Sequence, residues 1–168
     1  MEPAKIRELE NRLGHEFKNR KELYRALTHS TFSNVEKKKP IGSRDCPHQT
    51  TYATLGDAIL KAGIILLLME KGLKTKGDIT ISKADLENNL KLAEVGKRLR
   101  LFEDNLILHK VGTEEKVKEG AETYYSDTVE ALIGATFIDS NCSLPVTKDC
   151  IAKIFAPELD EIERKYNL

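Results

Sequence analysis

The stretch Thr54-Leu-Gly-Asp-Ala-Ile-Leu-Lys-Ala-Gly-Ile-Ile-Leu-Leu-Leu-Met-Glu70 is one of the two most apolar parts of the chain. Its apolar side chains cover nearly all sides of a helix, which is typical of a central, buried helix. We predict this helix from about Thr51 to Lys71, with Gly72 as its stop. One acid, Asp57, and one base, Lys61, interrupt the apolar sequence.

A second apolar stretch, Ser126-Asp-Thr-Val-Glu-Ala-Leu-Ile-Gly-Ala135, carries Asp127 and Glu130 three positions apart, so both share one helix face. An ionised carboxylate removed from water needs a compensating partner. If the two helices face each other, Asp57 joins this pair, and a divalent metal is the leading partner. Hard oxygen ligands favour Mg²⁺ or Mn²⁺, and such a site can activate water for attack on a phosphodiester.

The residues leave other roles open for the three acids. Asp57 could pair with Lys61 or cap a local turn. Asp127 could be an N-cap residue that accepts the amide hydrogens of Val129 or Glu130. Glu130 could face solvent, although its neighbours are apolar.

Composition limits the class of protein. A chain of 168 residues fits one domain, 1–168, with a core large enough to need no disulfides. The 27 basic and 27 acidic residues balance, so charge gives no sign of a nucleic-acid partner. The basic runs at 37–39, 71–76 and 97–100 are, taken alone, typical of solvated surfaces.

The sequence also indicates a compartment. The three cysteines form no C-x-x-C pair and leave an odd thiol, which favours a reducing, intracellular setting. The apolar run from Ile59 to Met69 contains Lys61 and is too short to cross a bilayer, and the N-terminus lacks the form of a signal peptide. We therefore expect a soluble, cytoplasmic protein with no membrane partner.

The remaining periodicity is helical, without alternating strand patterns of useful length. A first helix begins near Pro3 and ends at Gly14, and a second begins at an Asn19/Glu22 capping box. We expect a polar connection over 34–49 and three further helical regions. These run from a cap at Thr80 or Ser82 to about Leu99, from about Glu114 to Ile138, and from about Val146 to Tyr166 with a break near Pro157. The predicted architecture is an all-α bundle.

Four motifs in order match those of one known enzyme family. Thr50-Thr-Tyr-Ala-Thr-Leu-Gly-Asp-Ala58 corresponds to a run of the form E-x-x-E-F-L-G-D-A, of which only the second half is kept. Ala26-Leu-Thr-His-Ser30 is similar to A-L-T-H-S, and Lys83-Ala-Asp-Leu-Glu-Asn88 with Leu92-Ala-Glu94 to R-A-x-L-V-N. Asp127-Thr-Val-Glu-Ala-Leu-Ile-Gly-Ala135 matches a second acidic helix. With landmarks that span about residues 6 to 155, the chain resembles the ribonuclease III family, the dimeric endonucleases of double-stranded RNA.

The resemblance implies a ribonuclease III endonuclease-domain helical bundle that forms a symmetric homodimer around an RNA cleft. It implies that Asp57, Asp127 and Glu130 are catalytic and bind Mg²⁺, with Mn²⁺ as a substitute, and that the products carry 5′-phosphates and short 3′ overhangs. Lys61, Lys83 and Asn88 map to candidate RNA contacts, and DNA is not an expected substrate. Because the sequence stops at Leu168, we expect no double-stranded-RNA-binding domain.

The departures from the family pattern concern the metal site. Family acids map to Thr50 and Ala53, which are neutral, and Lys61 lies one turn beyond Asp57. Both changes weaken cation binding. The short Mini-III subgroup also carries an alanine where Ala53 stands, so a missing first acid is compatible with activity.

The sequence is compatible with three functions. The first is a metal-dependent endoribonuclease that acts on double-stranded or structured RNA. The second is a catalytically inactive, ribonuclease III-like RNA-binding or ribosome-associated protein, and the third is a helical interaction module without an RNA role.

Overall fold

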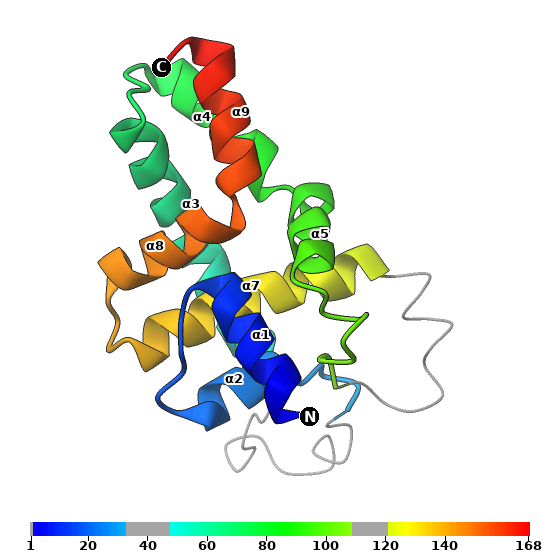
Figure 1. The fold of residues 1–168 in the computed structure, drawn as a ribbon. Coiled ribbons are helices and arrows are strands. Elements are labelled where there is room, and N and C mark those ends of the chain that lie inside the picture. The colour runs from blue at the N-terminus through cyan, green and yellow to red at the C-terminus, as the bar shows by residue number, and fades with distance from the viewer. Residues whose placement is uncertain (1, 33–47, 109–120) are drawn as a thin grey trace.

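The computed structural model describes residues 2–32, 48–108 and 121–168, and these parts fold as helices (Figure 1). The helices are α1 (Pro3–Leu13), α2 (Arg20–Ala26), α3 (Thr50–Glu70), α4 (Lys76–Glu87), α5 (Asn89–Arg98), α7 (Ala121–Asp139), α8 (Leu144–Ile154) and α9 (Ala156–Tyr166). Within the described residues, β-pairing is limited to one isolated bridge between Thr28 and Leu108. The predicted all-α class is confirmed.

Helices α3 and α7 pack against each other at the centre of the fold. A Cβ atom added at Gly56 of α3 would lie 1.7 Å from the carbonyl oxygen of Glu130, and one added at Gly134 of α7 would lie 2.2 Å from that of Tyr52. The two backbones therefore approach at a distance that only glycine allows. This crossing brings the acids of both helices to one level of the fold.

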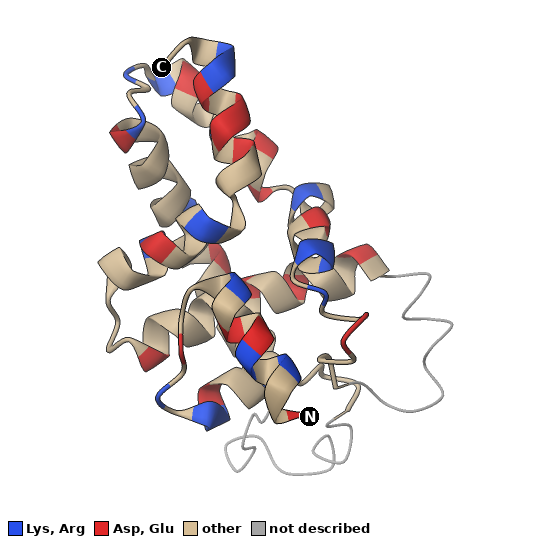
Figure 2. Ribbon diagram, in the orientation of Figure 1, with Lys and Arg blue, Asp and Glu red and all other residues tan. Residues whose placement is uncertain are grey.

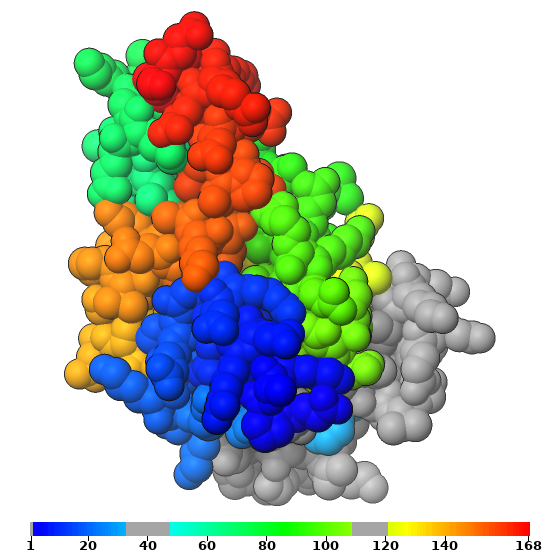
Figure 3. Space-filling model, viewed as in Figure 1, coloured from blue at the N-terminus to red at the C-terminus, as the bar shows by residue number. Residues whose placement is uncertain are grey.

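The remaining helices surround this central pair. Helices α2, α5 and α8 contact α7, and α4 and α8 contact α3, while α1 packs on α8. In the space-filling view, α1 covers much of the lower face between α8 and α5 (Figure 3). The core includes fully buried side chains of both central helices: Leu60, Ile64, Leu68, Val129, Leu132 and Ile133.

Helix α3 has the length and apolarity that a membrane span requires, so the expectation that this stretch is too short for one is wrong; it is the one such helix in the described ranges. Its Leu60, Ile64 and Leu68 are fully buried in this fold, where they take part in the main core. Core helices of soluble proteins meet the same criterion. The absence of a membrane partner stays a prediction.

Several predicted helix ends are confirmed by the backbone. Gly14 ends α1 in the left-handed region at φ 78°, and Gly72 follows α3 at φ 106°. Asn19 caps α2: its side chain accepts from the N–H of Lys21 and donates to Glu22 at 2.8 Å. The predicted start near Glu114 falls outside the described residues.

The predicted helix from Thr80 or Ser82 to Leu99 is wrong in its start and its continuity. Thr75 is the actual N-cap, because its hydroxyl accepts from the N–H of Asp78 at 3.1 Å and donates to the Asp78 carboxylate at 2.6 Å. Asn88 then adopts an extended conformation and caps a new helix, α5, by accepting from the N–H of Lys91. A hydrophobic period alone did not reveal these two caps.

Basic and acidic residues are interspersed over the outer helices (Figure 2), and several of them pair across helices. Arg98 makes a two-pronged contact with Glu158, with both distances 2.8 Å, and Arg100 contacts Asp104 at 3.2 Å. Two cations of the basic run 97–100 are thus engaged by acids of the same chain. This run serves the fold rather than forming a free basic patch.

We predict that Gly134→Ala lowers the free energy of unfolding by about 3 kcal/mol or more, because the new methyl group would overlap the Tyr52 carbonyl and force α3 and α7 apart. Urea denaturation followed by circular dichroism measures this change. Gly77→Ala is the control, since its Cβ would have no neighbour closer than 3.8 Å. Equal stability of the two variants would contradict the close crossing.

Candidate active site

A pocket of about 330 Å³ lies where the first turns of α3 face α7, beside the segment that follows α2. It is lined by His29, Ser30, Gln49, Thr50, Ala53, Thr54, Asp57, Asp127 and Glu130. The structure thus places the three predicted acids around one space. The position of Asp57 follows from its neighbour Gly56, which contacts the Glu130 backbone at the helix crossing.

The pocket holds more negative charge than the protein compensates. Burial, together with the nearby charges of Asp57 and Asp127, raises the pKa of Glu130 to about 7, although Lys61 acts in the opposite direction. Burial also raises the pKa of Asp127. Near neutral pH, the site therefore favours a bound proton or a bound cation.

Lys61 pairs with Asp57, which is one of the roles that the sequence left open for this acid. The ammonium lies 2.7 Å from Asp57 Oδ2, and this hydrogen bond raises the pKa of Lys61. The two side chains are 43% and 40% exposed, so the pair lies at the rim of the site. Exposed ion pairs of this kind contribute about 0–1 kcal/mol, and the Asp57 carboxylate can leave Lys61 at little cost.

The local structure does not support an N-cap role for Asp127 or a solvent-facing role for Glu130. Asp127 lies inside α7, six residues after its first residue, so the N-cap role is wrong. Glu130 is partly buried and lines the pocket, so it is not a plain solvent-facing residue.

The two neutral positions also lie at the pocket. Thr50 contacts His48 at 2.9 Å through its hydroxyl group, and Ala53 contributes only a methyl group. Sequence reasoning did not select Gln49 as a site residue. Its place at the end of a polar connection, directly before the first turn of α3, is the signal that could have identified it.

His29 and the candidate RNA contacts have local partners. The His29 ring stacks on Tyr124 at 4.1 Å and contacts Thr31 through Nδ1. Lys83 pairs with Glu87 one turn away at 2.6 Å, and Asn88 caps α5 and donates to the Asp85 carbonyl. The RNA contacts of Lys61, Lys83 and Asn88 stay predictions.

The donor set fits a hard divalent cation in its chemistry. Three carboxylates line one pocket, and burial together with the neighbouring acids raises the pKa of Glu130, so a hard cation there would relieve their repulsion. Within the described ranges, no three His, Cys, Asp or Glu side chains already stand at metal-binding spacing. Cation binding would therefore require side chains of the pocket to rotate toward one another.

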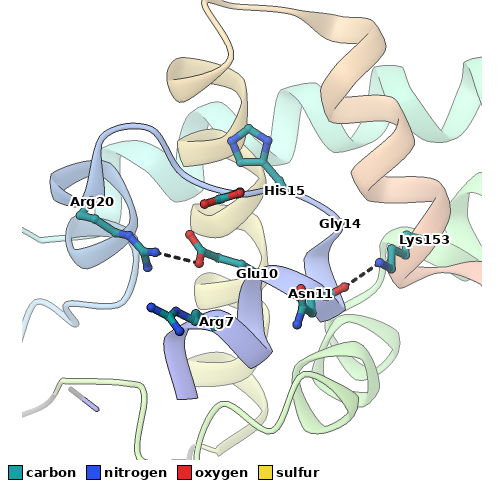
Figure 4. A pocket seen from close by; sticks show the side chains of 8 residues that line it. Arg7, Glu10, Asn11, Gly14, His15, Arg20 and Lys153 are labelled. Carbon is teal, nitrogen blue, oxygen red and sulfur yellow. Dashed lines mark hydrogen bonds and ion pairs between the residues drawn. The ribbon is translucent and has the colours of Figure 1, made fainter. Parts of the chain in front are cut away.

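A larger cavity, of about 750 Å³, is lined by α1 and the segment that follows it, with Arg20 of α2 and Lys153 of α8 at its sides (Figure 4). Its buried Glu10 carboxylate accepts from Arg20 at 3.0 Å and from the N–H of Phe17 at 2.9 Å. Lys153 donates to the Asn11 carbonyl at 2.6 Å. These contacts connect α1 to the segment before α2 and to α8, and we assign the cavity a structural role.

A family model described as Ribonuclease-III-like matches residues 19–158. The chain is 31% identical over 157 residues to ribonuclease 3 of Bdellovibrio bacteriovorus and 30% identical over 161 residues to that of Acinetobacter baylyi. Both alignments cover 92% of this chain, and the chain spans only 62% of the length of each relative.

Solved structures give the same fold. The chain is similar to the nuclease domain of ribonuclease III from Campylobacter jejuni in two structures, each with a TM-score of 0.73. Sequence identity is 26% and 25%, with coverage of 97% and 100% of this chain and 99% of the other. One of these structures is described as showing flexibility in a region involved in dimer formation.

We predict that Glu130→Gln stabilises the metal-free protein at pH 8 but not at pH 4. A pKa raised from 4.5 to about 7 in the folded state means that wild-type stability falls as pH rises through this interval, and glutamine removes the loss. After solvent screening, the gain is on the order of 1–2 kcal/mol.

Urea denaturation across this pH range, in the presence of a chelator, measures the effect. Glu122→Gln, at the exposed start of α7, controls for the loss of one negative charge. A difference between Glu130→Gln and wild type that does not change with pH would contradict the electrostatic account of the pocket.

Proposed function

Because the chain belongs to the ribonuclease III-like family, we propose that it is a metal-dependent endoribonuclease that hydrolyses phosphodiester bonds in double-stranded or structured RNA. The meeting of Asp57, Asp127 and Glu130 in one pocket supports this function. The three acids come from helices that are far apart in sequence, and the two other family acid positions are neutral here, at Thr50 and Ala53. Activity, substrate and partners are inferred here, since the chain spans 62% of its curated relatives.

In this proposal, Asp57, Asp127 and Glu130 hold Mg²⁺, which Mn²⁺ can replace. When bound, the ion supplies an activated water and stabilises negative charge on the phosphate. Asp57 would hold the ion from α3, and Asp127 and Glu130 would hold it from α7. In the metal-free pocket, burial and the neighbouring acids raise the pKa of Glu130 to about 7, so binding of the ion would release a proton from this side chain near neutral pH.

We further propose that the protein acts as a cytoplasmic homodimer. Leu66 and Met69 lie three positions apart at the end of α3 and are 36% and 55% exposed. Apolar side chains of this size on one helix face are suited to a subunit contact. The dimer described for the Campylobacter jejuni nuclease domain supports this assembly by analogy.

One set of observations favours the second function, a catalytically inactive RNA-binding or ribosome-associated protein. Thr50 and Ala53 supply no charge to the pocket, and Lys61 already contacts the Asp57 carboxylate. A protein of this type would bind duplex RNA without cutting it, in the presence or absence of Mg²⁺ or Mn²⁺.

We predict that Asp57→Ala abolishes cleavage of duplex RNA, with a loss beyond the roughly 10–100-fold that indirect metal partners cause. Cleavage is followed on a labelled duplex in Mg²⁺, and circular dichroism checks the fold. Asp85→Ala, which removes an exposed carboxylate of α4, should cleave normally. Undiminished cleavage by Asp57→Ala would refute the assignment.

Ala53→Glu should have the opposite effect. A carboxylate at this lining position adds an oxygen ligand and negative charge, so the Mg²⁺ concentration for half-maximal cleavage should fall and the rate should rise. A Mg²⁺ titration of cleavage measures both. If neither the wild type nor this variant cuts a duplex that both bind, the second function is selected.

A further inference from the structure

Gln49 is the most deeply buried polar side chain of the pocket, with 2% of its surface exposed. It precedes the first residue of α3, and its backbone N–H donates to the carbonyl of Thr28 at 2.8 Å. The base of the side chain is therefore fixed. At the other end of the side chain, one of the two polar atoms of the amide contacts the hydroxyl of Thr128 in α7.

The contact with Thr128 determines which way the Gln49 amide faces. Thr128 Oγ1 lies 2.7 Å from the Tyr124 carbonyl oxygen and 3.1 Å from Gln49 Oε1, so both neighbours are acceptors. The hydroxyl carries only one proton. The 2.7 Å contact has the length typical of an O–H···O bond, so the Thr128 hydroxyl donates its proton to the Tyr124 carbonyl. Thr128 Oγ1 and Gln49 Oε1 then face each other without a proton between them.

A half-turn of the amide removes this conflict. The two ends of a glutamine amide have the same shape, so the hydrogen-bond network decides their placement. With Nε2 toward Thr128, the 3.1 Å contact becomes an ordinary N–H···O bond. The carbonyl oxygen then takes the other position, which has no hydrogen-bond partner among the described residues, in a side chain that lines the pocket.

We propose that the Gln49 carbonyl oxygen is a neutral ligand of the divalent cation in this pocket, directly or through a water of its coordination shell. It stands one helical turn before Ala53 and compensates in part for the carboxylate missing there. Amide oxygens are accepted ligands of hard cations, and a neutral one adds no charge to a site that already holds three acids. This inference rests on the proposed metal dependence.

Mn²⁺ binding to the RNA-free protein, followed by electron paramagnetic resonance, tests the ligand without using activity. Gln49→Met keeps the length of the side chain and removes the oxygen, so the dissociation constant should rise roughly 10-fold. Gln49→Glu should lower it. Ser143→Ala, which removes the cap of α8 outside the pocket, is a control for general destabilisation and should bind like wild type.

The opposite amide orientation predicts the opposite change in the Mn²⁺ dissociation constant of Gln49→Met. With N–H groups facing the cation, Gln49→Met would bind Mn²⁺ as tightly as wild type or more tightly, and either result overturns this inference. If wild type cleaves RNA in that case, the proposed function is supported and only the ligand role of Gln49 is rejected. If wild type binds no Mn²⁺ and cleaves no duplex, both the proposed function and the ligand role of Gln49 are refuted. If Gln49→Met does not fold, an unchanged or weaker affinity of Gln49→Glu overturns the inference.

Discussion

The close approach of α3 and α7 is the constraint on which the rest of the molecule depends. Gly56 and Gly134 lie where each helix meets the other's backbone, and neither position has room for a methyl group. Dense packing of this kind fixes the rotation of both helices as well as their distance. Asp57 is therefore held beside the turn that carries Glu130, and the site follows from the packing of the core.

The same packing also brings the negative charges of the site close together. Acids on the two helices approach one another in a partly buried space, and the pKa of Glu130 rises to about 7 as a result. Lys61 relieves part of the repulsion from the rim. The neutral side chains of Thr50 and Ala53 work in the same direction, since they add no further negative charge to the pocket.

Charged residues elsewhere stabilise the fold through specific pairs. Arg12 contacts Asp104 at 2.8 Å, and the Asp139 carboxylate accepts from the N–H groups of Lys18 and Asn19 while it contacts His15. Burial raises the pKa of Asp139, but these hydrogen bonds outweigh it and hold the pKa below its ordinary value. The balanced composition reflects such internal pairing, so composition alone could not reveal a function.

The sequence by itself determined the helical class, most helix ends and the three acids, because periodicity, caps and buried charges are local properties of the chain. It did not reveal the caps at Thr75 and Asn88, where side-chain hydrogen bonds override the hydrophobic period. It left the pair of Asp57 and Lys61, one turn apart on α3, as one alternative among several, and only the tertiary structure decided that Gln49 is buried against Thr128. The reason is that rotamer choice and burial depend on neighbours brought together by folding, up to 79 positions away in the case of Gln49 and Thr128.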